Sequence, residues 1–377
     1  WRIRIKMEKL SLQEIISAVH GSYGYPADVE ISDISTDTRT IKPGSLFIAL
    51  KGENFDGHNF AAKAMELGAE AVVTERPVEG ARYMIVDSTA RALLDIAGYY
   101  RSKFDVKVVG VTGSVGKTTT KDMIALVVAQ KYKTLKTQGN HNNEIGMPQT
   151  LFGLDSSYEA AVIEMGMSHQ GEISRMSMSC QPDVAVITNI GISHIENLGT
   201  QENILKAKLE ILDGAAYDAP LILCRDDKLL AGVQLHSDRK VYYYSVSKKD
   251  CDVYASGVKT VDNSITFTIN YEGGKIAAQI NCLGEHNVKN ALAAFCVGLA
   301  LDIPPEDIVK GIAQFKPEGL RQNVTVIDGV TYIVDCYNAA PDSMKASLSV
   351  LSQAQAEGKR ICVLGDMLEL GKNSKTY

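Results

Sequence analysis

The feature that most constrains this chain is a glycine-rich turn between an apolar β-branched run and an amphipathic segment. The apolar run spans Val106 to Val111, and the residues from Asp122 to Val128 fit one broad helical stripe. Between them lies Gly113-Ser114-Val115-Gly116-Lys117-Thr118-Thr119. A strand, a glycine-rich turn and a helix in this order are typical of a phosphate-binding loop, because backbone N–H groups and the helix N-terminus surround phosphate oxygens. The sequence therefore predicts a nucleotide-binding α/β domain.

The turn is shorter than the usual phosphate-loop pattern. That pattern places a Gly five positions before Gly116, where this chain has Val111, so the loop is a G-x-x-G-K-T variant. We expect Lys117 to reach the outer phosphates and the Thr118 hydroxyl to hold Mg²⁺. The alternative is an ordinary glycine-rich turn, against which the Lys-Thr pair and the flanking strand and helix argue. The residues expected to bind phosphates are Gly113, Ser114, Val115, Gly116, Lys117, Thr118 and Thr119.

Composition narrows the class of protein. A chain of 377 residues with 45% hydrophobic and 22% charged residues is long enough for two or three globular domains. The net charge of -6 and the lack of a Lys/Arg cluster interleaved with aromatics argue against nucleic-acid binding, and no apolar run has membrane-spanning length. Seven scattered Cys without metal-ligand spacing, and an N-terminus without a signal-peptide core, predict a reduced, cytoplasmic protein.

The N-terminal region predicts a small α/β domain. Ser11 and Glu14 form a capping box for a helix that Gly21 is expected to end, and Ser45 to Leu50 reads as a strand. Trp1 to Lys6 precede Met7, a natural start, and are left out of the fold reasoning. Polar residues crowd two adjacent loops, where they serve either local turn geometry or ligand binding. These loops hold Ser35, Thr36, Asp37, Thr38, Arg39 and Lys51.

From Val106 onward strands and helices alternate, which predicts a mostly parallel sheet flanked by helices. The expected strands include Ala160 to Glu164, Val184 to Thr188 and Leu221 to Cys224, and Val253 to Cys282 alternates like an added antiparallel hairpin. Ligand sites in parallel sheets lie beyond the carboxyl ends of the strands. Three polar clusters follow this rule and are expected to share one crevice: Lys117 and Thr118; Glu164, Ser168 and His169; and Asn189 and His194.

The last part of the chain predicts the start of another α/β unit. After helices at His286 to Leu301 and Pro304 to Phe315, we expect a strand at Thr331 to Val334, a helix at Pro341 to Leu351 and a strand at Ile361 to Leu364. Roughly 60 residues make a thin domain, so a truncated third domain is expected. The expected domains are 1–105, 106–317 and 318–377.

Glu164, His194 and Lys208 are the candidate chemical groups outside the loop. Glu164 ends a buried strand and is a candidate Mg²⁺ ligand, the alternative being a carboxylate that emerges into solvent. His194 follows a strand, although a lone His is more often structural. Lys208 lies on the apolar stripe of the expected helix Gln201 to Leu212. Its ammonium is either buried, and then easier to deprotonate, or snorkels to the helix edge. Lys206 instead has Glu202 and Glu210 as partners on the solvated face.

These residues together resemble the Mur ligase family, the ATP-dependent amide ligases that build the peptidoglycan stem peptide. The resemblance covers the whole chain. It rests on the shortened loop and on these further features: Gly139-Asn140-His141-Asn142-Asn143-Glu144-Ile145-Gly146; His194 with Lys208 fourteen residues on; Gly284-Glu285-His286-Asn287-Val288-Lys289-Asn290; Arg321; and Asp335.

The resemblance implies a fold and a set of roles. The fold is a three-domain α/β architecture, with an N-terminal substrate domain, a central phosphate-loop sheet and a C-terminal Rossmann-like domain of which this chain holds part. The implied cofactors are ATP and Mg²⁺, and the implied reaction runs through an acyl phosphate with a carbamylated lysine. The implied catalytic residues are Lys117, His194 and Lys208; the metal ligands are Thr118, Glu164, His194 and Lys208; and further ATP contacts are His286, Asn287, Asn290, Arg321 and Asp335.

Four further stretches are similar to the family members that add D-alanyl-D-alanine to a UDP-N-acetylmuramoyl-tripeptide. They are Ser35 to Arg39, Ser168 to Glu172, Tyr337 to Ser343 and Leu364 to Gly371. The resemblance implies these two substrates and a monomer. The substrate-binding residues that we expect are Ser35, Thr36, Asp37, Arg39, Lys51, Asn140, Asn143, Ser168, His169 and Arg175.

Two departures and three alternatives qualify the resemblance. Cys224 and Ala340 stand near positions where relatives commonly carry Asn. The family's third domain continues past Gly371, so a chain ending at Tyr377 is expected to bind its substrates and fail to turn over. The alternatives are a family member that adds the third stem-peptide residue, folylpolyglutamate synthase, against which the N-terminal uridine-type domain argues, and a nucleotide-binding module without ligase activity.

Overall fold

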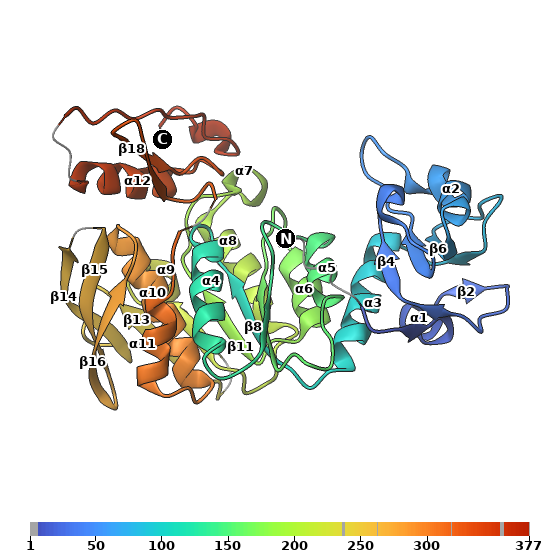
Figure 1. Ribbon diagram of the computed structural model, residues 1–377, viewed down its shortest axis with the longest axis horizontal. Coiled ribbons are helices and arrows are strands. Elements are labelled where there is room, and N and C mark those ends of the chain that lie inside the picture. The colour runs from blue at the N-terminus through green and yellow to red at the C-terminus, as the bar shows by residue number, and fades with distance from the viewer. Residues whose placement is uncertain (1–6, 236–237, 262, 318, 355–357, 377) are drawn as a thin grey trace.

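The computed structural model describes residues 7–235, 238–261, 263–317, 319–354 and 358–376. Trp1–Lys6, which the sequence analysis set aside, lie outside the described residues. Three units follow one another along the chain (Figure 1). An N-terminal unit is joined through a long helix to a central sheet, and a C-terminal unit lies over one end of that sheet.

The N-terminal unit is built on a five-stranded sheet whose inner strands are parallel. Its strand order is β2 (Ser22–Tyr23), β7 (Tyr83–Ile85), β6 (Ala69–Thr74), β5 (Ser45–Ile48) and β4 (Asp33–Ser35). A short antiparallel pair, β1 (Leu10–Ser11) and β3 (Glu30–Ile31), lies beside it. The helices are α1 (Leu12–Val19), α2 (Ala61–Glu66) and α3 (Thr89–Ser102), with 3₁₀ turns η1 (Thr38–Thr40) and η2 (Gly57–Phe60).

The capping box predicted for the first helix is present. The Ser11 hydroxyl accepts the N–H of Glu14 at 3.2 Å, and the Glu14 carboxylate accepts the N–H of Ser11 at 2.8 Å. The predicted end at Gly21 is wrong by one residue, because His20 takes the left-handed conformation at φ 50°. Gly21 is required for packing instead, since a Cβ there would lie 2.7 Å from the Met84 side chain.

The central unit contains a nine-stranded mixed sheet. The first six strands in sheet order are parallel: β9 (Thr134–Lys136), β10 (Ala160–Glu164), β8 (Lys107–Thr112), β11 (Val184–Ile187), β12 (Leu221–Cys224) and β13 (Val241–Ser245). Strand β14 (Val253–Val261) still pairs in parallel with β13, and the antiparallel addition predicted from the sequence continues from it through β15 (Ser264–Tyr271) and β16 (Gly274–Ile280). The mostly parallel sheet with an antiparallel extension is therefore confirmed.

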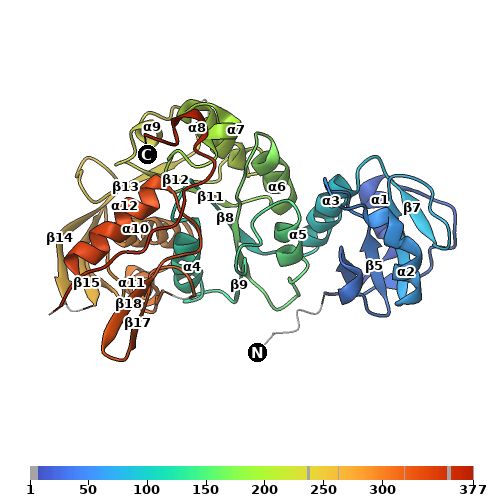
Figure 2. The same cartoon turned by 90° about the horizontal axis from the view of Figure 1, so that it is seen from above.

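Helices cover both faces of the parallel part. Helices α4 (Lys117–Val128) and α6 (Glu172–Cys180) both pack on β8, and Figure 2 shows them on opposite sides of it. Helices α10 (Glu285–Ala300) and α11 (Pro305–Ala313) pack against α4. The remaining elements are α5 (Gly146–Leu151), α7 (Ile195–Leu198), α8 (Gln201–Leu209), η3 (Glu210–Leu212) and α9 (Lys228–Ala231).

Three adjacent strands bring the predicted polar clusters to one edge. Strand β8 pairs in parallel with β10 on one side and β11 on the other. In this register Glu164 lies opposite Val111, and Ile187 lies opposite Thr112. The three strands therefore end level with one another, so the segments that follow them begin at the same edge of the sheet.

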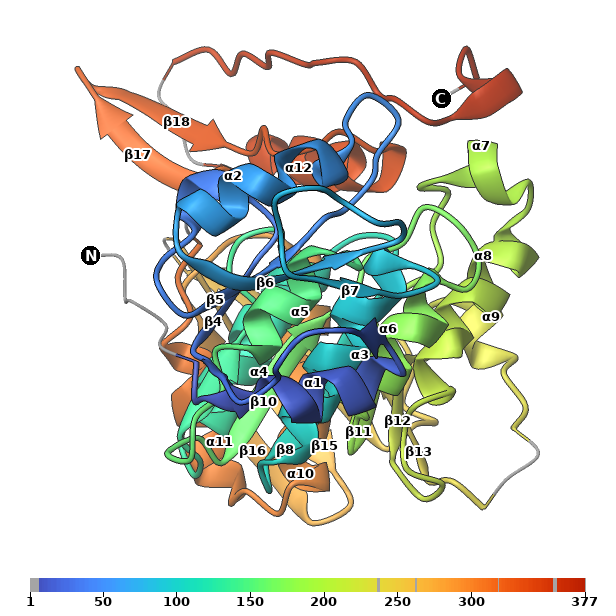
Figure 3. The ribbon, with the colours of Figure 1, turned by 90° about the vertical axis from the view of Figure 1, so that its right-hand side faces the viewer.

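The C-terminal unit is small and lies beyond this same edge, on the side of α7 (Figure 3). It contains the antiparallel hairpin β17 (Asn323–Ile327) and β18 (Val330–Val334), the helix α12 (Pro341–Gln353) and the 3₁₀ turn η4 (Gly371–Asn373). The strand predicted at Ile361 to Leu364 is wrong. No strand in the part of the chain that the structure describes pairs with this segment, and its apolar side chains are exposed, Val363 by 95%.

Candidate functional site

The phosphate loop follows β8 and leads into α4, as predicted. Gly116 is the residue before the helix and has φ 78°, while Gly113 has φ 152°. Both glycines are required, because left-handed φ values disfavour side chains and a Cβ on Gly113 would lie 1.9 Å from the Thr188 hydroxyl. The loop leads directly into the first turn of α4, and the N–H groups at the start of a helix bind anions.

Two residues after β11 hold the loop in this shape. The Asn189 side chain accepts the N–H of Val115 at 3.0 Å and donates to the Val115 carbonyl at 2.8 Å. The Thr188 hydroxyl donates to the same carbonyl at 2.8 Å. Neither residue was among the predicted site residues, although Asn189 was recognised as polar at the end of a strand. Their role depends on a contact across the sheet that the linear sequence does not reveal.

Lys117 points back into the loop. Its ammonium donates to the carbonyls of Gly113 at 2.9 Å and Ser114 at 3.3 Å. Burial lowers the pKa of Lys117, the Glu164 carboxylate opposes this shift, and the Arg321 guanidinium adds to it. No carboxylate among the described residues forms an ion pair with Lys117, so its positive charge at the point where phosphates would lie suits an anionic ligand.

Glu164 is buried at the end of β10, with 1% of its surface exposed. This excludes the alternative of a carboxylate emerging into solvent. Its Oε1 accepts Asn142 Nδ2 at 2.7 Å and the Thr118 hydroxyl at 3.3 Å, whereas its Oε2 is buried without a hydrogen-bond partner among the described residues. A buried carboxylate oxygen without a donor is costly. The pair of Thr118 and Glu164 is therefore a donor set that fits a hard cation such as Mg²⁺.

His194 and Lys208 lie near each other and near Lys117. Burial lowers the pKa of His194, and the charges of Lys117 and Lys208 add to that effect against the opposing Glu369 carboxylate. His194 Nδ1 faces Glu369 as an ion pair without hydrogen-bond alignment. The described residues contain no group of three or more His, Cys, Asp or Glu side chains arranged for a metal, so a metal here would need the hydroxyl or lysine ligands as well.

Lys208 is buried, as its place on the apolar stripe predicted. Only 2% of its surface is exposed, whereas Lys206 is exposed. Burial, together with the charge of Lys117, lowers the pKa of Lys208 well below the usual value. Among the described residues no acceptor forms a hydrogen bond with its Nζ, so the neutral amine is favoured over a buried, unpaired ammonium.

The partners predicted for Lys206 are not observed. Glu210 instead accepts the N–H groups of Gly171 at 2.8 Å and Ser174 at 3.3 Å, at the start of α6. A carboxylate at this position offsets the unpaired N–H groups of the helix N-terminus. No ion pair of Lys206 is present in the described part of the chain, and the prediction of a Lys206 to Glu210 pair is wrong because α6 competes for the carboxylate.

A cavity of about 490 Å³ lies beside the loop, between the central and C-terminal units. It is lined by predicted nucleotide-binding residues from four separate places in the chain: Val115, Gly116, Thr119, His286, Asn287, Asn290, Arg321 and Asp335. Cys224, one of the two departures from the family pattern, also lines it. Because the cavity adjoins Gly116, it has the position that a nucleoside would occupy with its phosphates on the loop.

The C-terminal unit supplies polar groups to the cavity wall. The Arg321 guanidinium lies over the Tyr337 ring at 4.1 Å, and the Asp335 carboxylate accepts the Ser347 hydroxyl. Asp342, at the start of α12, approaches Gly191, where a Cβ would lie 2.6 Å from its Oδ2. Gly191 therefore permits the close approach of the two units beside the phosphate loop.

The predicted substrate residues of the N-terminal unit lie on one pair of loops. The Arg39 guanidinium is held by Asp37, with Nε to Oδ2 at 3.0 Å and Nη2 to Oδ2 at 2.6 Å, and this hydrogen bonding lowers the pKa of Asp37. The Ser35 hydroxyl donates to the Asp37 carbonyl at 2.8 Å. The Lys51 backbone forms an isolated bridge with Asp56. Thr36 lies between the Ser35 and Asp37 positions and is half-buried.

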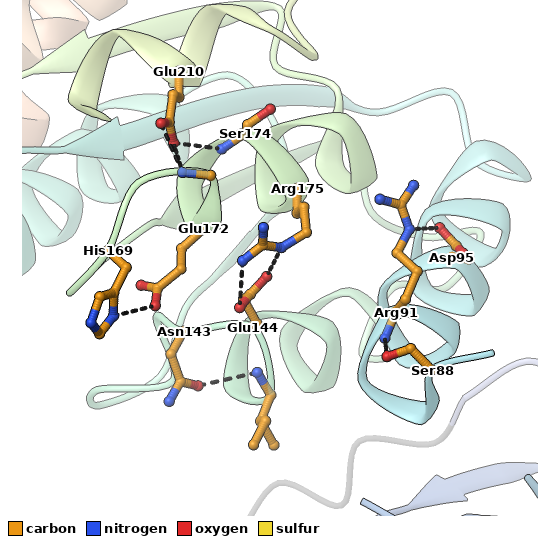
Figure 4. A network of polar contacts seen from close by, with 12 residues as sticks. Ser88, Arg91, Asp95, Asn143, Glu144, His169, Glu172, Ser174, Arg175 and Glu210 are labelled. Carbon is orange, nitrogen blue, oxygen red and sulfur yellow. Dashed lines mark hydrogen bonds and ion pairs between the residues drawn. The ribbon is translucent and has the colours of Figure 1, made fainter. Parts of the chain in front are cut away.

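The remaining predicted substrate residues gather on the rim of the central unit that faces α3 (Figure 4). Arg175 forms an ion pair with Glu144, with Nη2 to Oε2 at 3.1 Å, and His169 lies 3.3 Å from Glu172. Glu172 also accepts the Ser168 N–H at 2.8 Å. Asn143 caps α5 by accepting the Gly146 N–H at 2.8 Å, and Asn140 is exposed nearby. The structure therefore divides the predicted substrate set between two surfaces.

Comparison with known proteins places this geometry in a family. The descriptions Mur ligase middle domain, Mur ligase family catalytic domain and Mur ligase glutamate ligase domain match residues 111–298, 30–100 and 320–377. A UDP-N-acetylmuramoyl-tripeptide–D-alanyl-D-alanine ligase of Bacillus subtilis (strain 168) is 41% identical, with 98% of this chain and 81% of the relative covered. The chain belongs to the Mur ligase family. The ligase of the same name from Escherichia coli (strain K12) is 35% identical, covering 98% of this chain and 82% of that protein.

Solved Mur ligases have the same fold. MurF from Acinetobacter baumannii superimposes with a TM-score of 0.93 at 35% identity, covering 98% of this chain and 82% of that chain. MurF ligase from Thermotoga maritima in complex with ADP gives a TM-score of 0.82 at 30% identity, covering 91% of this chain and 79% of that chain. The three-domain α/β Mur ligase architecture predicted from the sequence is thereby confirmed.

Proposed function

We propose that this chain is an ATP-dependent ligase that joins D-alanyl-D-alanine to the tripeptide carboxylate of a UDP-N-acetylmuramoyl-tripeptide. The observation that carries the proposal is the convergence of Lys117, Glu164 and Lys208 at one sheet edge beside the 490 Å³ cavity. The names of the relatives at 35–41% identity support the same substrates. The chemistry of these residues fits phosphoryl transfer to a carboxylate.

The reaction needs an activated acyl group, because a carboxylate is a poor acyl donor. A tripeptide carboxylate oxygen attacks the γ-phosphorus of ATP, and ADP leaves. The dipeptide amine then attacks the acyl carbon, loses a proton and expels phosphate, which completes the amide. The residues of the chain bind and orient: the loop holds the phosphates, and Lys117 offsets the negative charge that gathers during transfer.

We place Mg²⁺ at Thr118 and Glu164. The partnerless Oε2 of Glu164 and the adjacent hydroxyl supply oxygen ligands of the kind that this ion takes. Bound there, Mg²⁺ would supply charge neutralisation for the phosphates. Asn142 fixes the other carboxylate oxygen through its 2.7 Å hydrogen bond, so Oε2 stays directed at the site.

We further propose that Lys208 is carbamylated. Its neutral amine attacks CO₂, one proton is lost, and the resulting carbamate is an anion. The change removes a buried amine that lacks a hydrogen-bond acceptor among the described residues and creates an anion near Lys117, whose positive charge favours it. Lys208 and His194 then complete the ligand set predicted from the sequence.

The substrates are assigned to the two remaining surfaces. We assign the uridine diphosphate end to the loops of Thr36, Arg39 and Lys51, because a diphosphate requires cationic donors. The peptide is assigned to the rim of Asn143 and Arg175. No helix in the described residues is long and apolar enough to cross a membrane. As the family resemblance implies, we propose a monomeric enzyme that acts in the cytoplasm.

A ligase that adds the third stem-peptide residue is the second candidate. The solved ligase for 2,6-diaminopimelate is 20% identical with a TM-score of 0.67, which speaks to the fold alone. The relatives at higher identity favour D-alanyl-D-alanine.

Phosphate release separates these candidates. With ATP, Mg²⁺ and the UDP-linked tripeptide, we expect release that depends on D-alanyl-D-alanine and falls on the order of 100-fold or more in Lys117→Ala. Calorimetry with ADP is measured in parallel. Binding of ADP without phosphate release that depends on D-alanyl-D-alanine identifies a nucleotide-binding protein without turnover. Release that depends on diaminopimelate, with a UDP-linked dipeptide in place of the tripeptide, identifies the other ligase.

A further inference from the structure

A chain of buried hydrogen bonds connects the phosphate-loop helix with the C-terminal unit. The Thr120 hydroxyl on α4 donates to Asn290 Oδ1 at 3.0 Å, and Asn290 Nδ2 donates to Asn287 Oδ1 at 3.1 Å. Asn287 Nδ2 lies 3.1 Å from Gln322 Oε1, and His286 Nε2 lies 3.2 Å from the same oxygen. We call these five residues, Thr120, Asn290, Asn287, Gln322 and His286, the Gln322 relay.

One backbone carbonyl fixes the direction of every bond in the relay. Asn287 Nδ2 lies 2.7 Å from the Leu283 carbonyl, which can only accept, so this atom is the amide nitrogen. Its second hydrogen points to Gln322, whose nearby atom must therefore be the oxygen. The Asn287 oxygen, in turn, can only accept from Asn290, whose own oxygen accepts from Thr120.

The same reasoning fixes the protonation of His286. Because the Gln322 atom is an acceptor, His286 Nε2 must carry the hydrogen. Burial lowers the pKa of His286, which favours the neutral ring with Nδ1 as an acceptor. A Cβ on Gly284 would lie 2.3 Å from His286 Cε1, so glycine at 284 is required for the ring to take this place.

The relay forms part of the wall of the nucleotide cavity. His286, Asn287, Asn290 and Gln322 all line the 490 Å³ cavity. Thr120 is buried one turn into α4, where its N–H donates to the Gly116 carbonyl at 2.9 Å. The chain of bonds thus runs from the phosphate loop, along the cavity, to the segment just before β17.

We propose that Gln322 is a positioning residue for nucleotide binding. Its single carboxamide oxygen orients both His286 and Asn287 and connects the C-terminal unit to the phosphate-loop helix. The inference rests on the ATP site proposed above. No hydrogen bond of Gln322 Nε2 occurs within the described residues, so only the oxygen acts. A carboxylate at this position can therefore replace the amide, whereas an apolar side chain cannot.

The first experiment compares Gln322→Leu with Gln322→Glu by calorimetry with ADP and by steady-state kinetics. Gln322→Leu leaves two buried donors without an acceptor, so we expect the Kd for ADP and the KM for ATP to rise about tenfold, with the KM for the dipeptide unchanged. Gln322→Glu keeps the acceptor and should stay within about threefold of wild type. Asn323→Leu, the same kind of change one residue on without a side-chain hydrogen bond among the described residues, is the matched control.

The second experiment tests the connection through Thr120→Val. Removing the far hydroxyl should weaken ADP binding by about threefold, and the double variant with Gln322→Leu should bind no more weakly than Gln322→Leu alone. If the losses of ADP affinity in the two single variants multiply in the double variant, Thr120 and Gln322 act independently and the proposed connection between them is wrong. Wild-type affinity in Gln322→Leu, or equal impairment in Gln322→Glu, would overturn the role of the oxygen.

The third measurement does not depend on activity or on the folding of Gln322→Leu. In protein with ¹⁵N-labelled histidine, the His286 signals, identified by their loss in His286→Gln, should show a neutral ring with hydrogen on Nε2. A hydrogen on Nδ1 would overturn the relay. If wild type itself fails to bind ADP while this tautomer is present, the nucleotide assignment fails and the relay geometry stands.

Discussion

At the scale of single residues, burial separates two lysines that lie two positions apart on α8. Lys208 is buried and Lys206 is exposed, as the helical spacing predicted. The spacing could not predict the fate of Glu210, because its carboxylate bonds to α6, an element that lies close only in the folded chain. Local periodicity determines which way a side chain points, and tertiary contacts determine what it meets.

We expect Lys208→Ala to abolish most ligase activity and Lys206→Ala to retain nearly all of it. An exposed lysine on a helix contributes at most about 0.3–0.5 kcal/mol through pairing, whereas Lys208 is proposed to carry the carbamate. Phosphate release with both substrates measures the effect, and a small carboxylate added to Lys208→Ala should restore part of it. Equal activity of the two variants would remove the proposed role.

At the scale of elements, alternation of apolar runs predicted the central sheet well. The bounds of β10 and β12 match the predicted strands, because each is a short buried run between polar turns. Strand β17 was not predicted, and the segment at Ile361 to Leu364 is not a strand, because pairing depends on a neighbour that the sequence does not specify. The site residues, too, were predictable where the signal is local and not where it depends on tertiary contacts. The loop residues were readable from their spacing, whereas Asn189 and Gln322 act through contacts made only by folding.

The junction between α1 and α3 predicts an acid-sensitive contribution to stability. The Glu14 carboxylate accepts hydrogen bonds from Lys103 at 2.6 Å, from the Ser11 N–H at 2.8 Å and from the Tyr99 hydroxyl at 2.9 Å. The Lys103 bond, followed by that of Ser11, lowers the pKa of Glu14 from 4.5 to about 2. A lowered folded-state pKa means that the contribution is present above pH 4.5 and disappears as the pH falls toward 2.

We therefore expect Glu14→Gln to lower the free energy of unfolding by about 1 kcal/mol at pH 7 and by less as the pH approaches 2. Urea unfolding at several pH values, monitored by circular dichroism, measures this difference. Glu66→Gln is the control, since the exposed Glu66 pairs with Lys63 one turn away and with no other cation in the part of the chain that the structure describes. A difference from wild type that is constant across this pH range would contradict the assignment.

At the scale of the whole molecule, the N-terminal unit carries the proposed diphosphate site apart from the sheet edge where ATP is assigned. Arg39 is already engaged by Asp37, so part of its charge is offset before any ligand arrives. We expect Arg39→Ala to weaken binding of the UDP-linked tripeptide about tenfold in calorimetry, without changing ADP affinity. Arg82→Ala, which breaks a comparable ion pair with Glu70 in the same unit, should bind the tripeptide like wild type. Unchanged tripeptide affinity in Arg39→Ala would exclude it from the site.

The contact between His194 and Glu369 joins the C-terminal unit to the sheet edge at a distance from the cavity wall. Because Glu369 does not line the 490 Å³ cavity, we expect Glu369→Ala to keep ADP affinity within about twofold and to lower kcat about tenfold. Asp366→Ala, at an exposed position of the same segment, is the control. Loss of ADP affinity together with kcat would indicate a general displacement of the unit instead.

Buried apolar side chains are distributed unevenly between the two interfaces of the central unit, one with the N-terminal unit and one with the C-terminal unit. One continuous core runs from Met7 to Phe315 and includes Tyr100, whose hydroxyl donates to the Leu154 carbonyl at 2.6 Å. Beyond residue 318, the described chain buries only Pro341, Val350 and Leu370 among its apolar side chains. Separating the N-terminal unit from the central unit would expose apolar side chains to water. The C-terminal unit is held to the central unit by polar groups, whose hydrogen bonds water can replace. We therefore expect the C-terminal unit, and not the N-terminal unit, to move relative to the central sheet, and such a movement would open the 490 Å³ cavity to which the nucleotide is assigned.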